Sequence, residues 1–143
     1  MIRAVLDTNV LVAALLSPLG NPAQLIEVIY KRQLALAYST AILDEYREVL
    51  ARPKFGFDPY AIEALLLLIK NSGICAQPDP SLSASITHSP DPEDDAIILC
   101  AAASQPEFIV TGSLKHFPLL VYNGARVLLP REMLEHLRTR QFP

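Results

Sequence analysis

Short apolar runs that stop at polar turn residues alternate with helix-like segments along most of the chain, and this alternation limits the fold more than any other feature. The first run, residues 2–6, ends at Asp7. The further strand candidates are residues 34–38, 74–76, 108–111 and 127–129. Apolar runs of about four to eight residues between turn signals are typical of strands buried in a sheet.

Helix signals fall between these runs. Ser39 stands where an N-cap residue is needed, and Pro59 opens a further segment. Asp91 followed by Pro92 has the pattern of an N-cap with proline at the first helical position. The helix candidates are residues 10–16, 22–31, 40–51, 60–71, 92–104 and 131–140. The alternation predicts an α/β fold with a mostly parallel sheet, in a single domain that spans residues 1–143.

The composition argues against several classes of protein. Hydrophobic residues make up 51% of the chain and charged residues 19%, which disfavours a disordered chain and a coiled coil. No uninterrupted apolar stretch approaches the ~20 residues that a membrane span needs. None of the five glycines belongs to a phosphate-binding loop, so nucleotide-dependent chemistry is disfavoured as well.

Charge and cysteine content bear on partners and on the compartment. The net charge is −3 and no run of Lys or Arg is present, so nucleic-acid binding must depend on a local arrangement. Cys75 and Cys100 lie far apart in apolar sequence, and we expect both to be buried and reduced. The N-terminal residues lack the pattern of a signal peptide. We therefore expect a cytoplasmic protein that does not contact a membrane.

Three acidic residues are candidates for one site. Asp7 ends the first strand, and ligands of an open parallel sheet bind beyond the carboxyl ends of its strands. Glu45 lies on or beside the apolar stripe of the helix 40–51, and Asp94 heads the stripe of the helix 92–104. Each residue also has a structural alternative: a turn or cap for Asp7, a surface salt bridge for Glu45, and helix capping for Asp94.

Three carboxylates at one edge of a sheet would repel one another. At a spacing of ~5 Å and an effective dielectric constant near 20, each pair costs about 3 kcal/mol. A divalent cation removes this cost, and oxygen ligands suit Mg²⁺ or Mn²⁺, whereas no His/Cys set with zinc spacing is present. Metal centres of this kind commonly activate water for in-line attack on a phosphodiester.

Four short motifs carry a resemblance to a known family. They are Val5-Leu6-Asp7-Thr8-Asn9-Val10, Leu43-Asp44-Glu45-Tyr46, Asp91-Pro92-Glu93-Asp94-Asp95 and Phe108-Ile109-Val110-Thr111-Gly112. In order and spacing they resemble the motifs of the PIN-domain ribonucleases, in particular the VapC-like toxins of bacterial and archaeal toxin–antitoxin pairs. The resemblance spans about residues 2–135.

The resemblance implies a three-layer α/β/α sandwich with a central mostly parallel sheet, and a metal-dependent endonuclease that acts on RNA. Asp7, Glu45 and Asp94 match the family's first three acidic positions, so the resemblance makes them both catalytic residues and metal ligands. Asn9 and Thr111 match polar positions near that site. The resemblance also implies a homodimer and an antitoxin partner whose C-terminal segment blocks the acidic edge.

The chain departs from the family at Ser113, where an acidic residue is often found. Serine is a poor metal ligand, so Asp91 and Asp95 become candidates to compensate. Lys115 and His116 follow directly and are candidates for phosphate contact or, for His116, for proton transfer. The alternative for both is an exposed loop.

The sequence leaves two functions open. The first is a metal-dependent endoribonuclease that is the toxin of a toxin–antitoxin pair. The second, suggested by Ser113, is a catalytically degenerate PIN-like module that binds RNA or a protein partner without cleavage. A phosphatase is disfavoured because Asp7 is followed by Thr8 and Asn9 and not by a second aspartate. A basic edge beside Glu45 or, alternatively, a solvated helix face is expected from Arg47, Arg52 and Lys54.

Overall fold

The central sheet contains six strands within residues 1–141, which are the residues that this computed structural model describes. The strand order across the sheet is β3-β2-β1-β4-β6-β5. The strands are β1 (Arg3–Leu6), β2 (Ala35–Tyr38), β3 (Ile74–Cys75), β4 (Phe108–Val110), β5 (Val121–Tyr122) and β6 (Ala125–Leu128). Neighbouring strands pair in parallel except β5 and β6, which are antiparallel. The predicted α/β fold with a mostly parallel sheet is confirmed.

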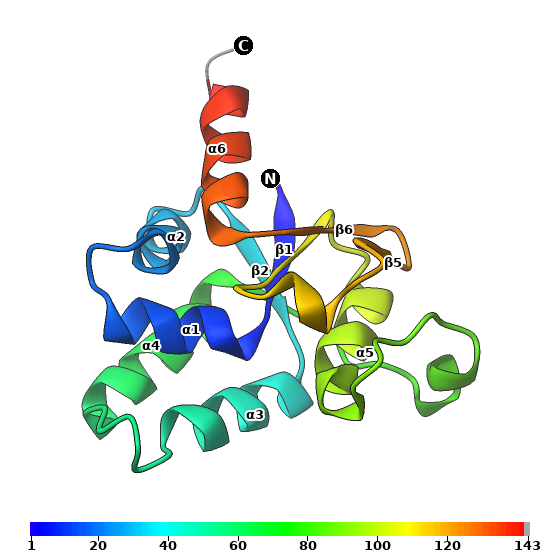
Figure 1. The fold of residues 1–143 in the computed structure, drawn as a ribbon, viewed down its shortest axis with the longest axis horizontal. Coiled ribbons are helices and arrows are strands. Elements are labelled where there is room, and N and C mark those ends of the chain that lie inside the picture. The colour runs from blue at the N-terminus through cyan, green and yellow to red at the C-terminus, as the bar shows by residue number, and fades with distance from the viewer. Residues whose placement is uncertain (142–143) are drawn as a thin grey trace.

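Helices pack around this sheet in the manner of the expected three-layer α/β/α sandwich (Figure 1). In the described part of the chain they are α1 (Thr8–Leu16), α2 (Asn21–Tyr30), α3 (Thr40–Leu50), α4 (Pro59–Ser72), α5 (Asp95–Ser104) and α6 (Pro130–Gln141). Short 3-10 turns are η1 (Pro80–Ala84), η2 (Pro92–Asp94) and η3 (Leu114–His116). The three strands β1, β2 and β4 are almost wholly buried, as expected for the middle of a sheet covered on both faces.

Local sequence signals start α3 and α4 where these helices were predicted. The backbone N–H of Ile42 donates a 3.2 Å hydrogen bond to the Ser39 hydroxyl, which caps α3. The N–H of Tyr60 donates a 2.9 Å hydrogen bond to Oδ1 of Asp58, which caps α4 ahead of Pro59. These caps fix the first turn of each helix and therefore the direction of the side chains that follow.

The segment before α5 differs from the prediction. A helix was expected from Pro92 onward, but residues 92–94 form the 3-10 turn η2 and α5 begins at Asp95. The carboxylate of Asp91 accepts a 2.9 Å hydrogen bond from the N–H of Glu93, which tightens the chain before the α-helix starts. Asp94 consequently occupies the N-cap position of α5 and not its first turn.

Two further expectations were wrong. The two-residue strand β5 was missed because it is shorter than the pattern of a typical strand, although Asn123 and Gly124 mark its hairpin turn with positive φ values. Cys75 is exposed on the edge strand β3, whereas it was expected to be buried. Cys100 is buried as predicted, and burial raises the pKa of its thiol to about 12.

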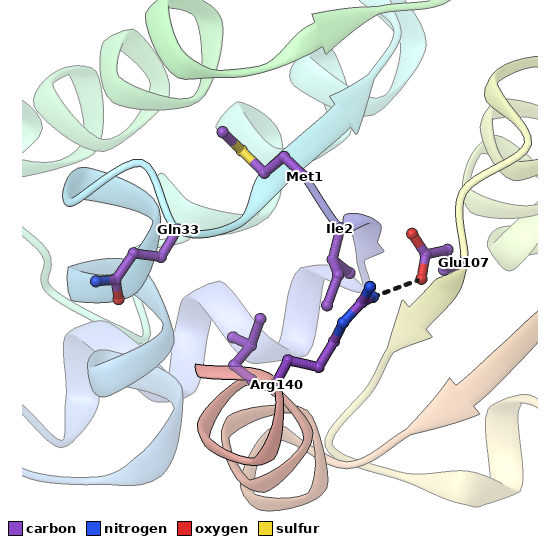
Figure 2. A pocket seen from close by; sticks show the side chains of 6 residues that line it. Met1, Ile2, Gln33, Glu107 and Arg140 are labelled. Atoms are coloured by element: carbon purple, nitrogen blue, oxygen red, sulfur yellow. Dashed lines mark ion pairs between the residues drawn. The ribbon is translucent and has the colours of Figure 1, made fainter. Parts of the chain in front are cut away.

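A cavity of about 290 Å³ lies at the amino ends of β1 and β4, under helix α6 (Figure 2). Met1 and Ile2 line it, and an ion pair with a 3.7 Å separation between Arg140 and Glu107 lies beside it. In parallel sheets ligands bind at the opposite edge, beyond the carboxyl ends of the strands. We therefore expect the functional site at the other edge of the sheet, beyond the carboxyl ends of its strands.

No single helix of the described residues combines the length and the apolar character needed to cross a membrane. The successive helices α1 and α2 reach that length and character only together, and a bend of 103° separates them.

Candidate active site

Asp7 and Thr111 meet at the carboxyl ends of the neighbouring strands β1 and β4. The N–H of Asp7 donates a 2.8 Å hydrogen bond to the carbonyl of Val110, and the Thr111 hydroxyl donates one of 2.8 Å to Oδ2 of Asp7. Both residues are buried. Asp7 stands at the N-cap position of α1, yet its carboxylate makes no capping hydrogen bond to that helix. The carboxylate is thus turned toward the edge of the sheet.

Asp94 approaches the same point from α5. It also occupies an N-cap position without making a capping hydrogen bond, and its side chain is buried. The hydroxyl of Ser89 donates a 3.2 Å hydrogen bond to Oδ2 of Asp94 and accepts one of 3.2 Å from the N–H of Asp91. Ser89 was not identified from the sequence, although the Ser-Pro-Asp-Pro run that contains it marks a tight turn.

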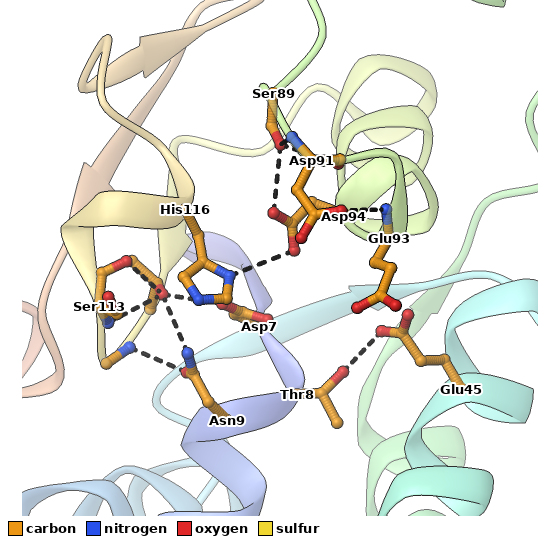
Figure 3. A network of polar contacts seen from close by, with 12 residues as sticks. Asp7, Thr8, Asn9, Glu45, Ser89, Asp91, Glu93, Asp94, Ser113 and His116 are labelled. Carbon is orange, nitrogen blue, oxygen red and sulfur yellow. Dashed lines mark hydrogen bonds and ion pairs between the residues drawn. The ribbon is translucent and has the colours of Figure 1, made fainter.

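His116 completes the cluster and comes from the 3-10 turn after β4. Its Nδ1 atom lies 3.4 Å from Oδ1 of Asp94 and 4.0 Å from Oδ2 of Asp7 (Figure 3). Ligand atoms of Asp7, Asp94 and His116 all lie within 4.8 Å of one another. The cluster therefore combines two buried carboxylates with one partly exposed imidazole.

Glu45 lines the same cavity but is not part of that cluster. The hydroxyl of Thr8 donates a 2.6 Å hydrogen bond to Oε2 of Glu45, so the partner of this carboxylate is a hydroxyl and not a basic side chain (Figure 3). Glu45 is half-buried, as its place beside the apolar stripe of α3 predicts. The structure thus brings the three predicted acids to one cavity and two of them to one point.

The remaining predicted residues have different surroundings. Asn9 accepts a 2.9 Å hydrogen bond from the N–H of Gly112, which ties the start of α1 to the loop after β4. The N–H of Ser113 donates a 3.1 Å hydrogen bond to the Thr111 hydroxyl. Lys115 lines a smaller cavity of about 230 Å³ next to Asp94 and His116.

The two acids considered as substitutes for the missing carboxylate are engaged elsewhere. Asp91 accepts the N–H of Glu93, and Asp95 lies 3.1 Å from Nδ1 of His88. Neither is part of the cluster of Asp7, Asp94 and His116 in the described residues. The imidazole of His116, and not a further carboxylate, is the additional group that the structure supplies beside Asp94.

Burial and mutual repulsion shift the acids toward their protonated forms. Burial raises the pKa of Asp7, the hydrogen bond from Thr111 opposes that rise, and the nearby charge of Asp94 adds to it. Burial also raises the pKa of Glu45, the hydrogen bond from Thr8 opposes the rise, and the charges of Asp7 and Asp94 add to it. These carboxylates would be more stable as anions if a cation lay between them.

The cavity that contains these groups has a volume of about 420 Å³, and both charged and apolar residues line it. The cluster, Glu45 and Glu93 line it, and so do Glu48, Arg52 and the apolar residues Val12, Val49 and Phe55. Val12 lies about one helical turn beyond Thr8 on α1, and Val49 lies about one turn beyond Glu45 on α3, so these apolar residues form an end of the cavity away from Asp7. Of the predicted basic edge, only Arg52 lines this cavity. Arg47 instead pairs with Glu63 on α4, at 3.0 Å from Nε to Oε1.

A family model of the PIN domain matches residues 3–115, which is most of the chain. The chain therefore belongs to the PIN domain family. A comparison with the curated proteins finds no match. PIN domains are typically nucleases that use divalent metal ions, so family membership and the acidic cluster together suggest a metal-dependent nuclease.

Proposed function

We propose that this protein is a metal-dependent endoribonuclease that hydrolyses phosphodiester bonds of RNA. The observation that carries the proposal is the meeting of Asp7, Asp94 and His116, whose ligand atoms lie within 4.8 Å of one another at the carboxyl edge of the sheet. Asp7 and Asp94 both hold N-cap positions without capping a helix, so helix capping does not account for these carboxylates. A cation accounts for both.

The residues of the cluster fit a divalent ion. Two buried carboxylates lie within reach of one point, and burial, with a smaller contribution from the charge of Asp94, raises the pKa of Asp7. Carboxylate oxygens suit Mg²⁺ and Mn²⁺, whereas an imidazole nitrogen is a poorer ligand for Mg²⁺ than for a transition metal. Asp7, Asp94 and His116 would therefore hold Mn²⁺ in preference to Mg²⁺, and Glu45 faces the same cavity.

When bound, a divalent ion supplies Lewis-acid activation of water and of the phosphate group. The chain's own residues set the geometry for that chemistry. The Thr111 hydroxyl donates a hydrogen bond to Oδ2 of Asp7, and the Ser89 hydroxyl donates one to Oδ2 of Asp94, so neighbouring side chains orient both carboxylates. Glu45, with a raised pKa and a hydrogen bond from Thr8, is placed to accept or return a proton during cleavage.

Removal of one cluster carboxylate tests the proposal. Asp7→Asn is expected to reduce cleavage of single-stranded RNA by at least about 100-fold and to abolish the rise in melting temperature on addition of Mn²⁺. Asp44→Asn on the exposed face of α3 is the matched control, with wild-type cleavage expected. Cleavage by wild type and Asp7→Asn at equal rates, with and without a chelator, would refute the assignment.

The toxin role is part of the same proposal and rests on the motif resemblance. As a toxin, the protein would arrest growth when produced alone, and a partner antitoxin would restore growth by covering the acidic cavity. A homodimer in solution is proposed on the same ground. Growth of cells that produce wild type or Asp7→Asn tests the role, because a toxin that acts by cleavage loses its effect with that single substitution.

The proposed alternative is a PIN-like module that binds RNA or protein without cleavage. The observation in its favour is Ser113, which leaves the loop after β4 without the acidic residue often found there. The same experiment separates the two functions. A module of this kind would show no thermal shift with Mn²⁺ and no cleavage by the purified wild type.

A further inference from the structure

The apolar end of the active-site cavity contains no residue of the cluster of Asp7, Asp94 and His116. Val12 of α1, Val49 of α3 and Phe55 line it, and it is continuous with the end that contains Asp7 and Asp94. The whole cavity measures about 420 Å³, within the range of about 300–1,000 Å³ usual for pockets that hold small ligands. A ligand that binds near Asp7 and Asp94 and fills the cavity would therefore also contact these apolar side chains.

Phe55 is presented to this cavity by a defined turn. Its N–H donates a 3.1 Å hydrogen bond to the carbonyl of Arg52, so both residues lie at the ends of one turn between α3 and α4. Gly56 follows with a φ of +63°, a conformation that favours glycine and lets the chain turn back. The backbone geometry of this turn thus holds Arg52 and Phe55, the two residues of the segment that line the cavity.

The ring of Phe55 lies outside the core. Its neighbour Phe57 packs against the core, and the two rings stack with centroids 5.3 Å apart and planes 10° apart. Phe55 itself belongs neither to the buried core nor to the half-buried residues packed on it, within the described chain. A half-buried aromatic ring that is backed by a second ring and borders a cavity is suited to stack against a flat ligand.

Arg52 adds a cation next to the ring. Its guanidinium lies 3.6 Å from a carboxylate oxygen of Glu48, and both side chains are substantially exposed. An exposed pair of this kind contributes little, so the guanidinium is available for a phosphate group. Lys54 lies with Nζ 5.1 Å from the centre of the Phe55 ring, a contact that is weaker than stacking by a nucleobase.

We propose that Phe55 and Arg52 form a nucleotide subsite for single-stranded RNA, in which the base stacks on Phe55 and the adjoining phosphate contacts Arg52. The inference rests on the proposed nuclease function, because it places this nucleotide next to the phosphodiester that the acidic end receives. Stacking on a side chain needs a base that is not already stacked in a duplex, which selects single strands. A planar base also fits the combination of ring and apolar wall better than an aliphatic side chain does.

A tryptophan reporter tests the subsite. The chain contains no tryptophan, so Phe55→Trp introduces a single fluorophore at the proposed stacking surface. The probes are uridine 5′-monophosphate, which has a base but no phosphodiester to cut, and ribose 5-phosphate, which lacks the base; both are titrated in buffer with Mg²⁺. The control is Tyr60→Trp, at a position that is 86% exposed and does not line the cavity.

Quenching of Phe55→Trp by uridine 5′-monophosphate, with none by ribose 5-phosphate and none in Tyr60→Trp, is the expected result. A second pair of variants avoids reliance on the reporter. Phe55→Leu keeps an apolar side chain but loses the ring, and it is expected to bind uridine 5′-monophosphate about 10-fold more weakly by titration calorimetry, with an unchanged melting temperature. Arg52→Gln is expected to weaken binding of both phosphate probes.

Two results would overturn the subsite: no quenching by uridine 5′-monophosphate, or equal quenching by both probes. Either would leave the apolar end for a peptide side chain or for packing alone. Neither depends on cleavage, so the subsite and the nuclease function fail separately. Cleavage of RNA by wild type without quenching refutes only the subsite, whereas quenching in a protein that never cleaves RNA refutes only the nuclease function.

Discussion

The hydroxyl of Thr111 donates a 2.8 Å hydrogen bond to Oδ2 of Asp7, although 104 positions separate the two residues in the chain. The parallel pairing of β1 with β4 makes this contact, because it sets Leu6 beside Val110 and so places the next residue of each strand at the same edge. The fully buried side chain of Thr111 thus orients the carboxylate of Asp7, which faces the cavity. The contact has measurable consequences for ion binding.

Thr111→Val removes this hydrogen bond while keeping the shape of the side chain. The hydrogen bond lowers the pKa of Asp7 against the effect of burial, so its loss raises that pKa further. Only the anion of Asp7 holds a cation, and the midpoint of Mn²⁺ binding is expected to move to higher pH. At neutral pH the affinity is expected to fall about 10-fold, in keeping with a hydrogen bond to a charged group. Calorimetric titration with Mn²⁺ at several pH values measures both effects, and Thr111→Ser, which keeps the hydroxyl, is expected to behave as wild type.

Asn123 is expected to support Asp94 from a distance. Its Oδ1 accepts a 2.9 Å hydrogen bond from the N–H of Thr87, and its Nδ2 donates one of 3.0 Å to the carbonyl of the same residue. This clamp holds the segment that leads to Ser89 and Asp94. Glycine adopts the positive φ of 51° at this position without strain, so Asn123→Gly removes only the side chain.

The loss of the clamp is expected to destabilise the protein by about 1 kcal/mol and to accelerate hydrogen exchange at the amide of Thr87. Mn²⁺ affinity is expected to fall together with that protection. Unchanged exchange at Thr87 in Asn123→Gly would show that the hairpin does not hold the loop.

The free energy of unfolding is expected to depend on pH through His88. Its hydrogen bond with the carbonyl of Ser83 and its pairing with Asp95 raise the pKa of His88 above its usual value of 6.5. A raised histidine pKa stabilises the fold fully at pH values below the unfolded pKa, and the stabilisation disappears as pH rises through the folded value. His88→Gln is expected to remove this decline. Urea unfolding from about pH 5.5 to about pH 8.5 measures it, and an identical slope in the variant would contradict the assignment.

Gly73 connects α4 to β3 at a point without room for a side chain. A Cβ atom there would lie 2.6 Å from the carbonyl oxygens of both Ile69 and Leu36. Gly73→Ala is therefore expected to lower the free energy of unfolding by about 2 kcal/mol or more, because backbone on two sides would have to move. Gly20→Ala is the matched control: its nearest neighbour would be the Ser17 hydroxyl at 3.2 Å, which can rotate away. Equal denaturant midpoints for the two variants would contradict the expectation.

The sequence was most informative where regular structure decides the direction of a side chain. Asp7 and Thr111 follow buried strands, and parallel pairing brings the ends of such strands together. The periodicity of α3 likewise places Glu45 beside the buried residues Ile42 and Tyr46. In each case the position could be predicted because strand and helix periods set it.

Loop geometry decided the rest of the site. His116 lies in a 3-10 turn and Ser89 in a proline-rich loop. Such segments lack the regular repeat of a helix or strand, so the sequence does not predict where their side chains point. The hydrogen bond from Thr8 to Glu45 could not be predicted either, because it joins residues of two different helices. Phe55 depends on a single turn and on its stack with Phe57, and neither feature has a sequence pattern of its own.

Helix α6 and the first residues of the chain lie together at the amino edge of the sheet, where Arg140 pairs with Glu107 (Figure 2). The acidic cavity opens at the other edge. An affinity tag or surface anchor joined through α6 is therefore expected to stand clear of the cavity mouth. Protein immobilised in this way would keep its reactive face toward the solution, which suits surface-based measurements of nucleotide capture.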